Sequence, residues 1–292
     1  ILQHRRFIRK YLMKNYLLVV SILTAATAVA QRPSCCSPAI EGFASMGDDM
    51  EFVAIHDEPL ALEATDLEGT MISYSTADGK TASAYFIPQE GSTDYLLVYH
   101  EWWGLNDHIK VFAERLHADL NINVIALDMY DGKVATTREA AGTYMQALDA
   151  SRGQAIVEGA IALANEQSNN AARFVQIGWC MGGGWSLQSA LLAESRSMGC
   201  VMYYGMPEKD IERLKTLNGP VLFVFANRDK WINRDVVEGF QKDMNKADRS
   251  LEILEFDADH AFANPSNLSY NEQAAEEAYT ASLSFLQNAL SN

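Results

Sequence analysis

The sequence is short of basic side chains. It holds 23 lysines and arginines against 38 aspartates and glutamates in 292 residues, which gives a formal net charge of -15. Contacts to nucleic-acid phosphates require clustered lysine and arginine. We therefore expect no nucleic-acid partner, and the acidic surface mainly favours solubility.

Cysteine is also scarce, with four residues in the whole chain, too few for a disulfide-rich scaffold. Cys35 and Cys36 are adjacent in the polar stretch QRPSCCSP. Cys200 lies in the apolar run GCVMYYGM and is expected to be an inert core thiol. Cys180, in QIGWCMGGGW, is the thiol whose surroundings call for a functional explanation.

The apolar stretch near the start is too short to span a bilayer. From Met13 the chain has a basic residue, an apolar run and a small-x-small pattern before Gln31, which is typical of a secretory signal peptide at residues 13–30. An uncleaved membrane anchor is the alternative. We expect residues 1–12 to be an upstream extension. The protein is then exported, periplasmic or secreted, and meets the membrane only through its export signal.

Beyond the leader we expect a linker at 31–48 and one domain at 49–292. The domain opens on a hairpin pattern, MISYST and KTASAYFIP around Asp78-Gly79. Continuous apolar runs then alternate with helical patterns, without repeats or low-complexity tracts. The runs are YLLVYH (95–100), NVIALDMY (123–130), RFVQIGW (173–179), CVMYYG (200–205), VLFVFAN (221–227) and LEILEFD (251–257). The helical patterns cover 109–120, 138–166, 185–193, 236–244 and about 270–290. This alternation predicts an α/β fold with a mostly parallel central sheet flanked by helices on both faces.

In such sheets, functional residues collect at the carboxyl ends of the strands. The strand RFVQIGW runs into Cys180, and the pattern G-x-C-x-G from Gly178 to Gly182 leads into a helix. This is typical of a nucleophile elbow, a sharp strand-to-helix turn in which a Cβ at the flanking positions would clash. The helix N-terminus favours a thiolate. The alternative is a glycine-rich turn with an incidental cysteine.

Two later strands end near triad partners for this thiol. Asp229 follows VLFVFAN and His260 follows LEILEFD, and each residue alone is more often structural. Their chain order of nucleophile, acid and histidine is that of an α/β-hydrolase. His260 would take the proton from Cys180 and later protonate the leaving group, while Asp229 would orient the imidazole. A thiolate–imidazolium pair and a neutral thiol are both compatible with the sequence as the resting state.

The strand YLLVYH ends in HEWWGLNDH. In this fold the loop after the third strand supplies one oxyanion-hole N–H and the residue after the nucleophile supplies the other. We assign these donors to Trp102 and Met181. Trp102 and Trp103 either line an aromatic substrate pocket or pack beneath the loop. Glu101 places a carboxylate near the thiol, unless it is a capping or solvated residue.

The motifs HEWWGLND, GWCMGGG, NRD and DHAFAN resemble those of the dienelactone hydrolase family, and the order of elements extends the resemblance from about residue 70 to 290. The resemblance implies an α/β-hydrolase that opens lactones or cleaves related esters with a Cys-His-Asp triad. By position, Cys180, Asp229 and His260 match that triad. Glu101 matches a glutamate that holds and activates the cysteine.

Founding members of that family also use two arginines for a substrate carboxylate. Arg138 matches one of them, and the other position holds Asn264. A neutral asparagine cannot form a charged bidentate clamp. We expect Trp103, Arg138 and Asn264 to contact a substrate that differs from dienelactone itself.

The sequence therefore predicts an exported hydrolase, carboxymethylenebutenolidase-like, that cleaves a small ester or lactone through an acyl-cysteine intermediate. We expect a monomer with no cofactor and no metal ion, whose partner is a small molecule. Two alternatives use the same residues. One is a non-catalytic ligand-binding protein on the hydrolase fold, and the other is a thiol amidase or peptidase.

Overall fold

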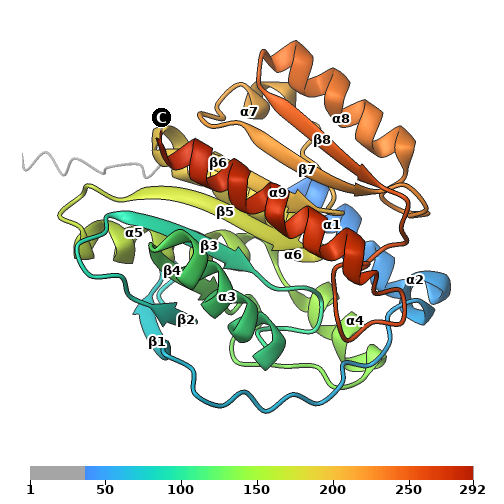
Figure 1. Ribbon diagram of the computed structural model, residues 1–292, viewed down its shortest axis with the longest axis horizontal. Helices are drawn as coiled ribbons and strands as arrows, with labels where there is room; N and C mark the ends of the chain where they lie inside the picture. Colours follow the sequence, from blue (N-terminus) through green and yellow to red (C-terminus); the bar gives the residue numbers. More distant parts are fainter. Residues whose placement is uncertain (1–36, 292) are drawn as a thin grey trace, which may run out of the picture. The chain divides into compact units, whose positions relative to one another are not determined.

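The computed structural model describes residues 37–291 (Figure 1). The expected upstream extension at 1–12 and signal peptide at 13–30 lie outside the described residues. Within 37–291, no helix is both long enough and apolar enough to cross a membrane.

The centre of the fold is a sheet of eight strands in the order β1-β2-β4-β3-β5-β6-β7-β8. β2 pairs antiparallel with β1 and with β4, and all other pairs are parallel. The predicted hairpin and all six later strands are confirmed. The strands are β1 (Thr70–Ser75), β2 (Thr81–Ile87), β3 (Asp94–Tyr99), β4 (Asn123–Leu127), β5 (Arg173–Trp179), β6 (Ser197–Tyr203), β7 (Val221–Ala226) and β8 (Leu251–Phe256).

Helices cover both faces of the sheet, as predicted. α3 and α9 contact each other on one face, while α5 and α6 contact each other on the opposite face (Figure 1). The interior strands β4 and β7 are buried along their whole length, as strands covered on both sides must be. The helices are α1 (Ser37–Ala44), η1 (Ser45–Asp48), α2 (Met50–Ala54), α3 (Asp107–Leu120), α4 (Arg138–Ala147), α5 (Ala150–Gln167), α6 (Met181–Ala193), η2 (Glu194–Arg196), α7 (Ile211–Leu214), α8 (Arg234–Ala247) and α9 (Glu272–Ser291).

The helical pattern over 138–166 is divided into two helices. Asp149 has an extended backbone at φ -67° and ψ 132°, and its carboxylate accepts hydrogen bonds from the N–H groups of Ser151 and Arg152. This N-cap satisfies donors that a continuous helix would direct to carbonyl groups, so the chain ends α4 and starts α5 here.

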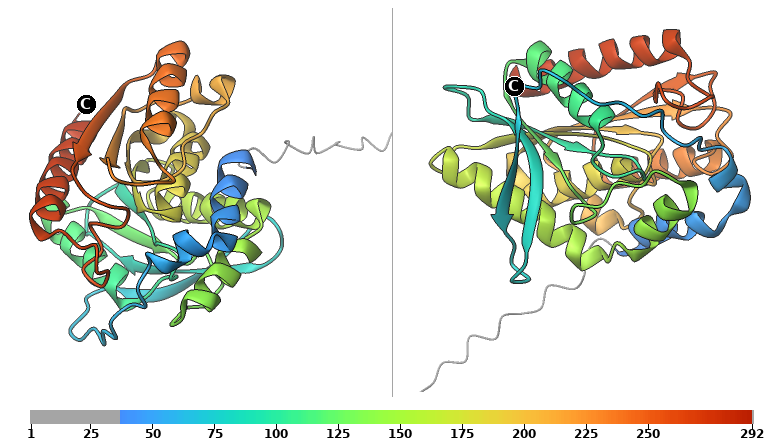
Figure 2. Two further views of the ribbon diagram at one scale, coloured as in Figure 1. Left: turned by 90° about the vertical axis from the view of Figure 1, so that its right-hand side faces the viewer. Right: turned by 90° about the horizontal axis from the view of Figure 1, so that it is seen from below.

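The structure contradicts the linker interpretation for residues 37–48, which form α1 and η1. Ala39, Ile40 and Phe43 share one helix face and are at most 4% exposed. α1 contacts α6, α4 and α5, and α2 contacts α4 (Figure 2). The apolar residues bury their side chains against the domain, so this segment is part of the fold.

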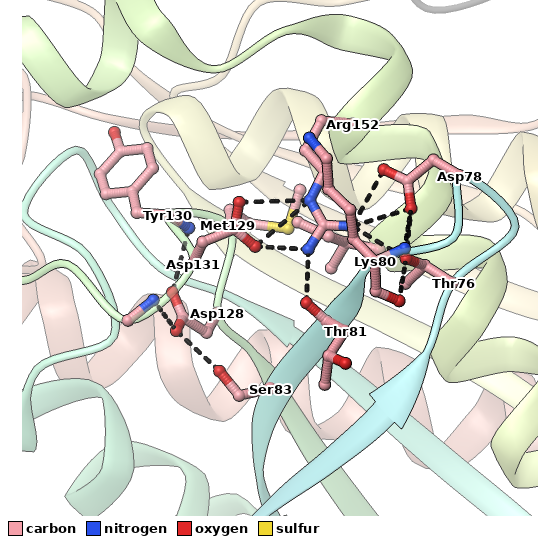
Figure 3. Close-up of polar contacts among 12 residues, drawn as sticks. Thr76, Asp78, Lys80, Thr81, Ser83, Asp128, Met129, Tyr130, Asp131 and Arg152 are labelled. Atoms are coloured by element: carbon pink, nitrogen blue, oxygen red, sulfur yellow. Dashed lines mark hydrogen bonds and ion pairs between the residues drawn. The ribbon is translucent and has the colours of Figure 1, made fainter.

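A polar network fastens the first hairpin to α5. Arg152 is 8% exposed and donates hydrogen bonds to the carboxylates of Asp78 and Asp131 (Figure 3). The same guanidinium reaches the Thr76 hydroxyl and the Thr81 carbonyl on the hairpin. A buried guanidinium is tolerated only when its donors are satisfied, and this one is.

The turn from β5 into α6 leaves no room for side chains at its glycines. A Cβ on Gly178 would lie 2.0 Å from the Gly182 carbonyl oxygen, and one on Gly182 would lie 2.3 Å from the Tyr99 oxygen. Between them, Cys180 has φ 58° and ψ -122°, a strained conformation for a residue with a Cβ. The sharp strand-to-helix turn that the sequence predicts is therefore present.

We predict that Gly178→Ala lowers the free energy of unfolding by about 3 kcal/mol, the upper end of overpacking penalties, because the new Cβ meets rigid backbone. Gly239→Ala is the matched control, since Gly239 lies inside α8 with open space around its Cβ position. Alanine there should raise the stability by about 0.5–1 kcal/mol. Urea unfolding of the three proteins measures both effects. Equal midpoints for the two variants would contradict the steric account of the elbow.

Candidate active site

Four buried polar residues meet at the carboxyl edge of the sheet. Glu101 follows β3, Cys180 follows β5, Asp229 follows β7 and His260 follows β8. These strands are parallel, so their carboxyl ends lie on the same edge. The four residues are at most 6% exposed. The structure thus brings together residues that the sequence spreads over 160 positions.

The contact between His260 and Asp229 is the most direct in the site. His260 Nδ1 donates to Asp229 Oδ2 at 2.5 Å. Asp229 Oδ1 accepts the backbone N–H groups of Trp231 and Ile232. Burial opposes the charged imidazolium, but the charge and hydrogen bond of Asp229 outweigh it, with help from Cys180, and raise the pKa of His260 to about 10.

Cys180 is a free thiol with no exposed surface. A ring nitrogen of His260 lies within 4.8 Å of its sulfur. Two influences oppose each other here: burial raises the thiol pKa, while His260 and the Met181 N–H lower it. The net direction is upward, because the thiolate loses its hydration entirely in this site.

Glu101 is held by two side chains. Asn264 Nδ2 donates to Glu101 Oε2 at 2.6 Å, and the Tyr204 hydroxyl donates to Oε1 at 3.5 Å. Burial raises the pKa of Glu101 to about 7, against the lowering effect of the His260 charge. Glu101 is therefore a carboxylate poised to exchange a proton near neutral pH.

His56 is a site residue that the sequence reasoning missed. Its Nε2 lies 3.9 Å from Cys180 Sγ, and its ring packs on Trp102 and His260 at centroid distances of 4.5 and 5.1 Å. Burial, followed by the charge of His260, lowers the pKa of His56 to about 3, so its ring is neutral. The spacing of Phe52 and His56 puts both on one helical face, but no motif in the sequence links that face to the thiol.

The segment that carries His56 closes the site. Phe52 is fully buried and packs on His56, Trp102, Trp231 and His260 at centroid distances of 4.4–5.8 Å. The segment is tied down at one end, where Asp49 accepts a hydrogen bond from Trp231 Nε1 at 2.9 Å. We call residues 49–57 the cover, because they shield the thiol from solvent.

Arg138 binds the cover. Its Nε donates to the His56 carbonyl at 2.5 Å and its Nη2 to Asp57 Oδ1 at 3.1 Å. These bonds use the guanidinium that the sequence assigned to a substrate carboxylate. A substrate role for Arg138 stays a prediction, and it would require this contact to open.

An apolar cavity adjoins Glu101. Trp103 and Asn264 line it, together with Phe112, Trp179 and neighbouring residues, whereas Arg138 is not part of its wall. Trp102 is fully buried beneath the cover instead, in an edge-on contact with Trp103 at a centroid distance of 4.9 Å. The two tryptophans thus differ: Trp103 borders a space that a ligand could enter, and Trp102 packs beneath the loop.

Comparisons with known proteins agree with this geometry. A carboxymethylenebutenolidase of Pseudomonas putida is 26% identical over 74% of this chain and 94% of its own length. Among solved structures, a dienelactone hydrolase-like promiscuous phosphotriesterase from metagenomic libraries has a TM-score of 0.65 at 20% identity, covering 76% of this chain and 99% of that one. An esterase of Pyrococcus furiosus has a TM-score of 0.56 at 15% identity, covering 80% and 99%. These structures share the α/β-hydrolase fold.

The family model described as "Dienelactone hydrolase family" matches residues 82–290, more than two thirds of the sequence. With the fold, the elbow and the buried polar residues at the strand ends, this match shows that the chain is an ester or lactone hydrolase and belongs to the dienelactone hydrolase family.

Proposed function

We propose that the protein hydrolyses a small ester or lactone through an acyl-cysteine on Cys180, with His260 and Asp229 completing a catalytic triad. The observation that carries this proposal is the buried His260–Asp229 pair beside the thiol at the elbow. Asp229 occupies Nδ1 of the imidazole, which leaves Nε2 for proton transfer.

The first step is formation of the thiolate. The raised pKa of His260 keeps its ring protonated at neutral pH, so it is a poor acceptor for the thiol proton. Glu101, whose pKa is about 7, is the better acceptor. We therefore assign the proton of Cys180 to Glu101, which leaves a thiolate paired with the His260 imidazolium.

The second step is acylation. The Cys180 sulfur attacks the ester carbonyl carbon, and the charge moves onto the carbonyl oxygen. The backbone N–H groups of Trp102 and Met181 are the proposed donors to that oxygen. When the tetrahedral intermediate collapses, the C–O bond of the ester breaks and His260 Nε2 gives its proton to the leaving alkoxide.

The third step is deacylation. His260 is now neutral and takes a proton from water, whose oxygen attacks the thioester carbonyl. The C–S bond breaks, the carboxylic acid departs, and the thiolate–imidazolium pair is restored. Asp229 stabilises the imidazolium in both half-reactions.

The substrate must fit a cavity without a free arginine. Asn264 is neutral and its amide already holds Glu101, and Arg138 is bound to the cover. The cavity beside Glu101 is bordered by Trp103, Phe112 and Trp179. We infer that the preferred substrate is a small neutral ester or lactone with an apolar or aromatic group.

We predict that Cys180→Ala lowers the rate of p-nitrophenyl acetate hydrolysis by on the order of 10⁴-fold or more, as losses of triad nucleophiles do. Cys200→Ala is the matched control: Cys200 is also a buried thiol, but its partner is Ser186 in the core. It should keep the wild-type rate. A Cys180→Ala enzyme as active as the wild type would refute the acyl-cysteine mechanism.

We predict a bell-shaped pH profile for kcat/KM. Glu101 must be deprotonated to accept the thiol proton, so the rate should rise as the pH passes through about 7. His260 must be protonated to serve the leaving group, so the rate should fall above about 10. Glu101→Gln should remove the lower limb and slow acylation. An unchanged lower limb in that variant would assign the activating base elsewhere.

We predict that substrate entry requires the cover to move, because Cys180 has no exposed surface in the closed structure. Phe52→Ala should therefore speed the alkylation of Cys180 by iodoacetamide. Mass spectrometry of the peptide that contains Cys180 measures the rate. Phe240→Ala, a buried phenylalanine of α8, controls for a general loss of stability of about 3–5 kcal/mol. Equal acceleration in both variants would show that global unfolding, rather than the cover, exposes the thiol.

A further inference from the structure

Three side chains around the thiol have the composition of a metal site. Cys180, His56 and His260 each offer one ligand atom, all three atoms lie within 4.8 Å of one another, and all three residues are buried. We propose that they bind a zinc-like divalent cation, which competes with acylation for the Cys180 sulfur. This inference goes beyond the proposed ester hydrolysis.

The distances suit such an ion. Zinc binds cysteine sulfur at about 2.3 Å and histidine nitrogen at about 2.0–2.1 Å, so tetrahedral ligands stand about 3.5 Å apart. The separation between His56 Nε2 and Cys180 Sγ is 3.9 Å. Small side-chain adjustments would bring the three ligand atoms to coordination distance.

The two imidazoles already present the correct nitrogen. His56 Nδ1 lies 2.7 Å from the Phe52 carbonyl oxygen, which can only accept, so Nδ1 carries the proton and Nε2 keeps a lone pair toward the sulfur. His260 Nδ1 donates to Asp229. Metal-binding histidines almost always donate their second ring N–H to a carboxylate or a backbone carbonyl in this way.

The other nitrogen of His260 is the second independent sign of a ligand. His260 Nε2 is buried and has no hydrogen-bond partner among the residues 37–291 that the structure describes. A buried polar atom without a partner is costly. A bound cation would take the place of the Nε2 proton and give this nitrogen a partner, together with Nε2 of His56.

The donor set selects the class of ion. One thiolate and two imidazoles suit zinc and similar borderline ions, whereas magnesium and calcium prefer oxygen. Binding replaces the thiol proton of Cys180 and the Nε2 proton of the His260 imidazolium, and both protons leave to solvent as the metal–ligand bonds form. Asp229 and Glu101 supply nearby negative charge. Three protein ligands leave a fourth position for water.

The site depends on a segment outside the family match. The family model covers residues 82–290, and His56 lies in the cover that precedes them. The sequence predicts no metal ion, and the three ligands lie far apart in the chain, at positions 56, 180 and 260. The proposal therefore assigns His56, which ester hydrolysis does not use, a chemical role.

The test is a Co²⁺ titration of the full chain carrying Cys35→Ser and Cys36→Ser, which removes the adjacent thiol pair as a competing ligand. We expect one equivalent to produce a thiolate-to-cobalt charge-transfer band in the near ultraviolet. Adding Cys180→Ser, an isosteric change, should abolish the band. Adding His56→Gln should weaken Co²⁺ binding by more than about 100-fold, the upper end for losing an outer-shell partner.

His117→Ala is the matched control, because His117 binds the Ile122 carbonyl at the end of α3. It should leave the titration unchanged. As a second measurement, Zn²⁺ should slow iodoacetamide alkylation of Cys180, and a chelator should restore the rate. Absence of the band, or a band that survives His56→Gln at full affinity, would overturn the proposal.

The metal proposal and the ester-hydrolase proposal fail separately. If Cys180→Ala loses ester hydrolysis and the protein that keeps Cys180 gives no cobalt band, the triad proposal stands and the metal site is refuted. A cobalt band together with unchanged hydrolysis in Cys180→Ala would refute the acyl-cysteine and retain the metal site.

Discussion

The close approach of α6 to the carboxyl edge of the sheet governs the chemistry of this protein. At Gly178 and Gly182 the backbone of the elbow touches the backbone of the sheet, so a methyl group added at either glycine would force the two backbones apart. That contact holds Cys180 at a positive φ and directs its thiol between the ends of β3, β7 and β8. Every functional contact of the sulfur depends on this position.

Burial then determines the protonation states around the sulfur. Three ionisable groups, Glu101, Asp229 and His260, lie in one nearly dry volume, and they respond differently because their partners differ. Asp229 accepts two backbone N–H groups and the imidazole, which hold its pKa low against the effect of burial. Burial raises the pKa of Glu101 to about 7, because the charge of His260 and the hydrogen bonds from one amide and one hydroxyl do not outweigh the loss of hydration. The exclusion of solvent from this volume also strengthens each electrostatic interaction within it.

The cover, which precedes the family match at residues 82–290, adds contacts around the thiol that the matched residues alone do not supply. Its aromatic residue Phe52 packs against His260, and His56 brings a second imidazole to the sulfur. Its attachment to Arg138 occupies a guanidinium that the sequence assigned to a substrate carboxylate. A single segment thereby covers the thiol, occupies Arg138 and places a second imidazole beside the sulfur.

The sequence by itself determined the strands, the elbow and the identities of the triad candidates. Apolar runs must be buried, glycines at 178 and 182 are needed in a strand-to-helix turn, and Cys180, Asp229 and His260 each follow a strand. These are local properties of the chain. The prediction of a linker at residues 37–48 was wrong, because the polar stretch before them drew attention away from the apolar residues Ala39, Ile40 and Phe43, which are buried. The sequence also gave no sign that His56 belongs to the site, since the role of a single histidine depends on the residues that surround it in the fold. Tertiary structure alone decided that neighbourhood, by folding the cover back over a thiol more than 120 positions away.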